Sequence, residues 1–232
     1  MSVEEEKTIA QKFWGKFISI GKKTFLNKKV LIISLVVIAV VLSLTIFYVM
    51  KVEKRRANVK KLYVNAFEKY KKVEGQIDKI NLDRAGIAIN ALKKVTNTNE
   101  SFSENYLAYF NLGNIYALLK KYNIAIKYYK KSMEASSSFF IRPKAMVHLS
   151  RIYILQNKNK LAENLLLKVA GENDNFYQDL AYYNLGSFYQ SKKNIKKAVE
   201  AFKKVRKKSA FFKNAQNSIE VIQRLKKINK NS

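Results

Sequence analysis

The chain has 232 residues, with 45 lysine and arginine residues against 17 aspartate and glutamate residues and a formal net charge of +28. It has no cysteine, which excludes a disulfide scaffold, a zinc–cysteine site, a thiol nucleophile and a lipid anchor on cysteine. Only one proline and seven glycines interrupt the sequence, so the composition predicts an almost entirely helical protein.

The first segment, residues 1–29, is a basic leader with aromatic residues at roughly helical spacing. This pattern predicts an amphipathic helix that lies in a membrane interface. The alternative is a disordered tail that only flanks the next segment. The apolar residues of the leader pattern are Phe13, Trp14, Phe17, Ile18 and Phe25.

The next segment, Val30 to Met50, holds 21 consecutive residues without a charge, a proline or a glycine. As a helix it would be roughly 30 Å long, which is the thickness of the hydrocarbon core of a bilayer. A cleaved signal peptide fits less well, because the segment is long and no small-residue cleavage site follows it. A buried core helix fits less well, because the hydrophobicity is not confined to one face. We therefore expect a transmembrane helix over residues 30–50.

Residues 51–104 are expected to hold a linker helix and a partial first repeat. Apolar residues recur every three or four positions from Val59 to Val73, which predicts an amphipathic helix that continues directly from the apolar segment. A second helix is predicted over residues 83–96. The residues expected on its apolar face are Ile87, Ala88, Ala91, Leu92 and Val95.

Residues 105–210 contain a pattern that occurs three times. In each unit a large residue, a leucine, a small residue and a tyrosine occur in this order at fixed spacing. The leucines are Leu112, Leu149 and Leu185, which lie 37 and 36 residues apart. In each unit an alanine follows the leucine by 13 residues, and a large residue follows the alanine by four. The sets are Tyr109, Leu112, Gly113, Tyr116, Ala125, Tyr129; then Met146, Leu149, Ser150, Tyr153, Ala162, Leu166; then Tyr182, Leu185, Gly186, Tyr189, Ala198, Phe202.

These units resemble the tetratricopeptide repeat, a helix pair with the pattern W-x-x-L-G-x-x-Y followed by alanine and a large residue. The chain departs from it in three ways: tyrosine or methionine replaces the tryptophan, Ser150 replaces one glycine, and the consensus proline is missing. The resemblance implies an all-α fold in which three to four helix pairs stack into an α-solenoid. A capping helix within residues 211–232, with Phe212, Ala215, Ile219 and Leu225 on its apolar side, is expected to close the end of the solenoid.

The resemblance also implies a binding groove, because the first helix of each repeat lines the concave face in this family. The groove would be aromatic and amide-rich, with a cationic spot at Arg151. The alternative for each lining residue is that it packs against the neighbouring unit. The expected lining residues are Leu107, Phe110, Asn111, Asn114 and Leu118, then Lys144, Val147, His148 and Arg151, then Leu180, Tyr183, Asn184 and Ser187.

One subset of these repeats grips the C-terminal carboxylate of a peptide with lysine, asparagine and arginine side chains. Only Asn114 matches that set here, since Phe110 replaces a lysine and His148 replaces an asparagine. The last cation positions are occupied by Leu180 and Asn184. The carboxylate-clamp mode is therefore not expected.

Catalysis has no basis in the sequence. There is one histidine, no phosphate-binding glycine loop, no metal-ligand spacing and no paired carboxylates on one helix face. We expect no enzymatic activity and no cofactor, and we expect other proteins as partners.

The order of leader, single span and repeats resembles the YfgM-type ancillary subunits of the bacterial Sec translocon. That resemblance implies a single-pass inner-membrane protein with a cytoplasmic N-terminus and a periplasmic repeat domain. Its partners would be translocon subunits, periplasmic chaperones and exported proteins. The flanking charge does not decide the orientation, because six basic residues precede the span and seven follow it within about 20 residues.

The net charge leaves a second hypothesis open, in which a cytoplasm-facing basic scaffold binds anionic lipid or nucleic acid. The lysines occur as scattered pairs on nearly every predicted helix, which also fits solvated helix faces in a lysine-rich proteome. Protein binding is the preferred hypothesis, and nucleic acid is not the expected partner.

Overall fold

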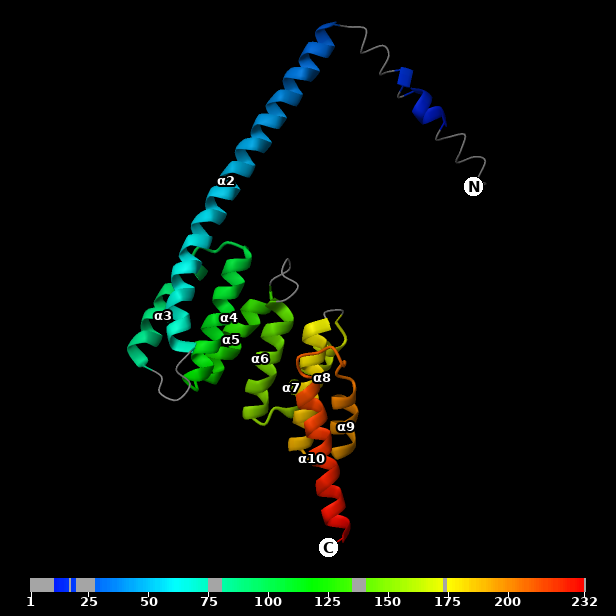
Figure 1. The fold of residues 1–232 in the computed structure, drawn as a ribbon. Coiled ribbons are helices and arrows are strands. Elements are labelled where there is room, and N and C mark those ends of the chain that lie inside the picture. Colours follow the sequence, from blue (N-terminus) through cyan, green and yellow to red (C-terminus); the bar gives the residue numbers. More distant parts are fainter. Residues whose placement is uncertain are drawn as a thin grey trace. The chain divides into compact units, whose positions relative to one another are not determined.

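The computed structural model describes residues 11–16, 18–19, 28–74, 81–134, 141–172 and 175–231. Every regular element in these ranges is a helix, which confirms the predicted all-α fold class (Figure 1). The structure divides the chain into a unit of residues 1–57 and a unit of residues 58–232.

The first unit contains the whole apolar segment, residues 30–50. Helix α2 runs without interruption over Lys28–Glu74, so the helix does continue from the apolar run into the second unit. Among the described residues, α2 is the helix long and apolar enough to cross a membrane, and none of its most apolar window is buried. The hydroxyls of Ser34, Ser43 and Thr45 donate to carbonyls of the same helix, so these side chains need no water as a partner.

In the leader, residues 11–16 and 18–19 are helical, and the side chains of Phe13, Trp14 and Ile18 are exposed. The other two leader aromatics, Phe17 and Phe25, lie outside the described residues. The interfacial role of the leader therefore stays a prediction.

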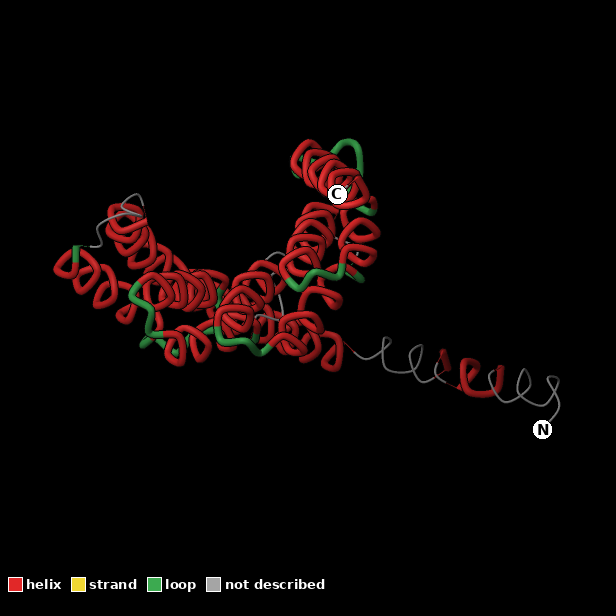
Figure 2. The backbone as a smooth tube through the Cα atoms, turned by 90° about the horizontal axis from the view of Figure 1, so that it is seen from below, coloured by secondary structure: helices red, strands yellow, loops and turns green. Residues whose placement is uncertain are grey.

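The second unit is a row of short helices that follow one another in an arc (Figure 2). Three helix pairs match the three sequence units: α4 with α5, α6 with α7, and α8 with α9. The bounds are α3 Leu82–Thr96, α4 Ser103–Leu118, α5 Tyr122–Met133, α6 Ile141–Leu155, α7 Asn159–Ala170, α8 Asn175–Ser191, α9 Ile195–Lys203 and α10 Phe212–Asn231.

The repeated small residue marks the point where the two helices of a pair meet most closely. A Cβ atom on Gly113 would lie 2.7 Å from ring carbons of Tyr129, and one on Gly186 would lie 2.5 Å from ring carbons of Phe202. At the equivalent place the middle repeat has Ser150, which is fully buried, and its second helix supplies Leu166 instead of a ring. Small residues are therefore required where a flat ring from the second helix covers the first.

The turn inside each pair is also the same in all three repeats. Lys120, Asn157 and Lys193 adopt left-handed backbone conformations with φ of 57°, 57° and 58°. The residue after each one donates its backbone N–H, at 2.8–2.9 Å, to the carbonyl of the repeat tyrosine on the first helix. These tyrosines are Tyr116, Tyr153 and Tyr189. These bonds pair carbonyls at the end of the first helix, as in a Schellman-type cap.

The second half of α2 and α3 occupy the position of a helix pair ahead of α4. Ala66 and Tyr70 of α2, Leu92 of α3 and Leu112 of α4 belong to one buried cluster. At the other end, α10 packs against α9 through Ala215, Ile219 and Ile222 together with Phe202 and Val205. The contact ends there: Leu225, expected on the packed side of the cap, is 54% exposed, because the helix continues past its neighbour.

Candidate protein-binding site

The first helices of the three repeats form the inner layer of the array, because α4 packs against α6 and α6 against α8. All the predicted groove residues lie on these three helices. Their exposure differs from repeat to repeat.

In the first repeat the two asparagines are used inside the protein. The side-chain amide of Asn111 donates to the Tyr63 hydroxyl at 3.2 Å, and that of Asn114 donates to the Tyr70 hydroxyl at 2.9 Å. Asn114 also accepts from the Tyr129 hydroxyl at 2.8 Å. Both asparagines and Phe110 are buried, while Leu107 and Leu118 are half-buried. These amides therefore join α4 to α2 and α5 and are not open to a partner.

The tyrosines of this network remain protonated. Burial raises the pKa of the Tyr70 phenol, and burial likewise raises the pKa of Tyr129. The Tyr70 hydroxyl donates a 2.8 Å hydrogen bond to the Glu74 carboxylate. The periodic aromatic stripe of α2 was visible in the sequence, but nothing local linked it to asparagines more than forty positions later.

In the second repeat a basic and aromatic cluster lies between α4 and α6. The Lys144 ammonium is 4.7 Å from the centroid of the Phe110 ring, and the His148 ring meets that ring edge-on at 4.9 Å. Burial lowers the pKa of His148 to about 4, with a further contribution from the charges of Arg151 and Lys144. His148 is therefore neutral at physiological pH, and the positive charge of this surface comes from Lys144 and the exposed Arg151.

In the third repeat Tyr183 stacks on Phe211 with ring centroids 6.0 Å apart and also contacts Phe202 at 5.8 Å. The Asn184 amide donates to the Leu180 carbonyl at 2.7 Å, and the Ser187 hydroxyl donates to the Tyr183 carbonyl at 3.1 Å. Ser187 is exposed, whereas Tyr183 and Asn184 are half-buried.

The inner layer thus presents fewer open side chains than the sequence register implied. Arg151 and Ser187 are exposed, and the half-buried residues leave part of their surface open. The four buried residues are covered by neighbouring helices, so they pack inside the protein and do not line an open groove. The half-buried residues are Leu107, Leu118, Lys144, His148, Leu180, Tyr183 and Asn184, and the buried ones are Phe110, Asn111, Asn114 and Val147.

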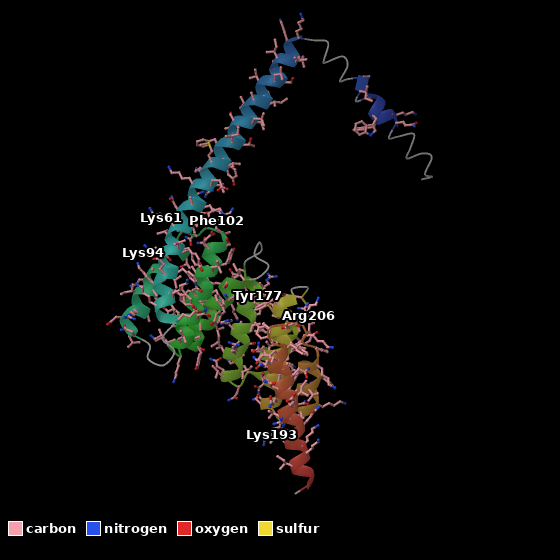
Figure 3. All side chains as sticks on the ribbon, in the orientation of Figure 1. Lys61, Lys94, Phe102, Tyr177, Lys193 and Arg206 are labelled. Carbon is pink, nitrogen blue, oxygen red and sulfur yellow. The ribbon has the colours of Figure 1, made fainter. Side chains whose placement is uncertain are left out.

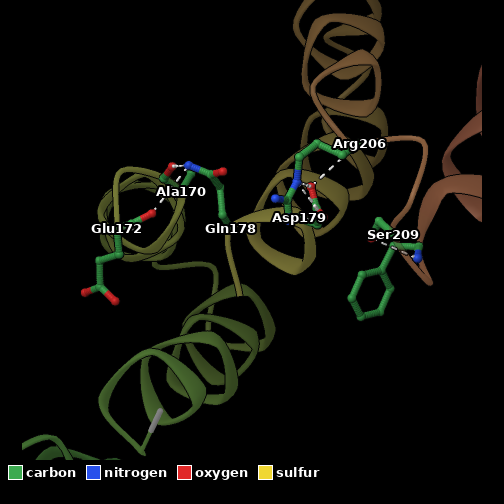
Figure 4. Close-up of polar contacts among 7 residues, drawn as sticks. Ala170, Glu172, Gln178, Asp179, Arg206 and Ser209 are labelled. Atoms are coloured by element: carbon green, nitrogen blue, oxygen red, sulfur yellow. Dashed lines mark hydrogen bonds and ion pairs between the residues drawn. The ribbon is translucent and has the colours of Figure 1, made fainter. Parts of the chain in front are cut away.

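One ion pair that the sequence did not indicate fixes the last repeat. The Asp179 carboxylate on α8 is almost fully buried and accepts from the guanidinium of Arg206 at 2.6 and 3.1 Å and from the Arg206 backbone N–H at 3.1 Å (Figure 4). Burial alone would raise the pKa of Asp179, but the hydrogen bonds and charge of Arg206 outweigh it and lower that pKa below its usual value. The pair holds the segment after α9 against the start of α8.

Comparison with known proteins supports the repeat assignment. Residues 106–139 and residues 180–205 match two profiles of the tetratricopeptide repeat. No curated protein matches the sequence.

Solved structures show the same fold. One crystal structure of MamA is 25% identical, with a TM-score of 0.50, over 69% of this chain and 84% of MamA. A second MamA structure is 23% identical, with a TM-score of 0.51, over 75% and 86% of the two chains. A putative kinesin light chain from Podospora anserina with nearly identical TPR-like repeats is 12% identical, with a TM-score of 0.52, over 73% and 90%.

Proposed function

We propose, from the premise that this chain is a tetratricopeptide-repeat protein, that it is a membrane-anchored module that binds segments of other proteins on its inner layer. The observation that carries the proposal is the stacking of α4, α6 and α8 into one continuous layer with Arg151 and Ser187 open on it. Stacked repeats of this kind provide extended surfaces for contact with partners.

The chemistry of the layer supports protein binding. Arginine and tyrosine contribute strongly to binding energy at protein interfaces, and Arg151 and Tyr183 are both accessible at least in part. The ring of Tyr183 is held by Phe202 and Phe211, so a partner would meet a side chain that is already ordered.

The apolar half of α2 supports the second part of the proposal, which is anchorage by a single span. A cytoplasmic N-terminus is part of the proposal because the chain has the layout of the YfgM-type subunits. The order of leader, apolar helix and repeats supports partners in the Sec machinery or among envelope chaperones and exported proteins. The competing function, a basic scaffold on anionic lipid or nucleic acid, is favoured by the net charge of +28.

The anchor is tested by placing an arginine in the middle of the apolar run. Ile38→Arg should cost roughly 2.5–3.5 kcal/mol of membrane insertion, because the run has no other charge. The measurement is the fraction of full-length protein that resists carbonate extraction. Val64→Arg is the matched control, because Val64 is 51% exposed on the same helix but lies beyond the apolar run. Equal extraction of the two variants would contradict anchorage by residues 30–50.

The binding surface is tested by photo-crosslinking in cells. A crosslinking residue at Arg151 or Ser187 should capture translocon subunits or exported proteins, while one at Lys196 should not. Lys196 is exposed but lies on α9, a second helix of its pair. Crosslinks from all three positions to lipid or nucleic acid alone, lost at about 0.5 M salt, would instead support the basic scaffold.

A further inference from the structure

The open end of the second unit carries a groove between the second half of α2 and α3. Its volume is about 780 Å³, and it extends from Asn58 to Lys69 along α2, a length of about 16 Å. The residues that line it are Asn58, Lys61, Leu62, Asn65 and Lys69 on α2 and Ile87, Asn90, Ala91 and Lys94 on α3.

The floor of the groove is apolar and uncovered. Leu62 is 39% exposed and Ile87 is 54% exposed, whereas Ala66 and Leu92 on the same two helices are fully buried in the cluster shared with α4. The groove therefore lies away from the side of the pair that packs on α4. In a stacked solenoid this is the place where the helix of a preceding unit would sit.

The rim of the groove is basic. Lys61 and Lys69 project from α2 and Lys94 from α3, and Figure 3 labels Lys61 and Lys94 on the two neighbouring helices. Among the described residues that line the groove, the other polar ones are asparagines and none is acidic. An apolar floor with cations on both margins is complementary to a helix that has one apolar face bordered by carboxylates.

We propose that this groove binds one acidic amphipathic helix of a partner protein, about three turns long. The proposal goes beyond the function proposed above, because it concerns a different surface and does not require binding on α4, α6 or α8. It also assigns a binding role to three of the many lysines, Lys61, Lys69 and Lys94.

Charge disfavours helix α10 of a second copy as the occupant. Helix α10 has exposed apolar residues at Val221, Leu225 and Ile228, as a docking helix would. Its sequence, however, has five basic residues against Glu220, which would place like charges on the lysine rim. The basic residues are Lys213, Arg224, Lys226, Lys227 and Lys230.

The test uses the full chain in nanodiscs of phosphatidylcholine and a fluorescent peptide of about 14 residues, which is about four helical turns. The peptide carries leucines at i, i+3, i+4 and i+7 with glutamates beside them, and a matched peptide carries lysines in place of the glutamates. Binding is measured by fluorescence anisotropy, with empty nanodiscs as the blank. The glutamate peptide should bind saturably and the lysine peptide should not.

Two variants separate the rim from the floor. Lys61→Glu, Lys69→Glu and Lys94→Glu together should weaken binding of the glutamate peptide about tenfold or more. Leu62→Asn with Ile87→Asn should weaken it by a similar factor, because the apolar anchor is lost. The control triple Lys192→Glu, Lys196→Glu and Lys203→Glu, at exposed positions on the last repeat, should bind as the wild type does.

Lys69 is half-buried and the other substituted side chains are exposed, so thermal unfolding should confirm an intact fold in each variant. Absence of saturable binding, an equal loss in the rim and control triples, or wild-type affinity in the floor variant would each overturn the proposal. Full competition by phosphatidylglycerol vesicles would also overturn it, by showing a general affinity for anionic surfaces.

Discussion

Replacing Arg206 by alanine is expected to lower the free energy of unfolding of the repeat unit by about 3 kcal/mol at neutral pH. The change leaves the Asp179 carboxylate buried, with its side chain only 3% exposed, and without its charged partner. The estimate is the lower end for a buried pair, because the Arg206 side chain is 43% exposed. Urea unfolding of the full chain in detergent, followed by helical circular dichroism, measures the difference.

The matched control is Arg224→Ala. Arg224 pairs with Glu220 at 3.9 Å on the exposed side of α10, with side-chain exposures of 79% and 60%. Such a pair on one helix is worth only about 0.3–0.5 kcal/mol. An equal loss of stability in the two arginine variants would show that Asp179 does not depend on Arg206.

The pH dependence of the Arg206 effect has a fixed sign. Because the pKa of Asp179 is lowered in the folded state, its stabilising contribution is complete above the ordinary carboxyl pKa of about 3.9 and is lost as the pH falls through the folded value. In Arg206→Ala burial should instead raise that pKa. The gap in stability between wild type and variant should therefore be largest at neutral pH. It should shrink as the pH falls through the raised pKa of Asp179 in the variant and on through the lowered pKa in the wild type.

Replacing Gly186 by leucine is expected to destabilise the third repeat by about 3 kcal/mol, at the upper end of the usual cost of overpacking. The first added atom alone would lie 2.5 Å from two ring carbons of Phe202, and Phe202 is fully buried and cannot move aside without displacing α9. A lowered urea midpoint with an unchanged slope is the expected result.

Gly86→Leu is the control for that substitution. Gly86 lies within α3, and nothing lies within 4 Å of the Cβ that a side chain would add there. Removing a helical glycine at an open position should stabilise the protein by about 0.5–1 kcal/mol. If both leucine variants shift the midpoint in the same direction, the close crossing of α8 and α9 is not the cause.

The sequence by itself determined the repeat architecture. The spacing of Leu112, Gly113, Ala125 and Tyr129 recurs because each helix pair must solve the same packing problem, with a small residue under a large one. That information is local, since every residue of the pattern lies within one pair of helices. The continuity of helix α2 through Met50 could also be predicted from local sequence, because neither a proline nor a glycine lies between Val30 and Glu74.

Tertiary structure decided which groove residues stay open. The family register placed Asn111 and Asn114 on the concave face, but Tyr63 and Tyr70, which lie 48 and 44 residues earlier, occupy their amides. Periodicity gives the face of a helix on which a residue lies, and it does not say which distant side chain covers that face.

The same limit applies to the buried ion pair and to the end groove. Asp179 meets Arg206 across 27 residues, through a connection whose path no local pattern specifies. Leu62 and Ile87 are apolar residues of amphipathic helices, and the sequence does not distinguish them from the buried Ala66 and Leu92 on the same helices. Among the described residues, the stacking order leaves this helix pair without a neighbour on one side. Spacing along the chain fixes each helix and each pair, whereas exposure depends on which elements are adjacent in space.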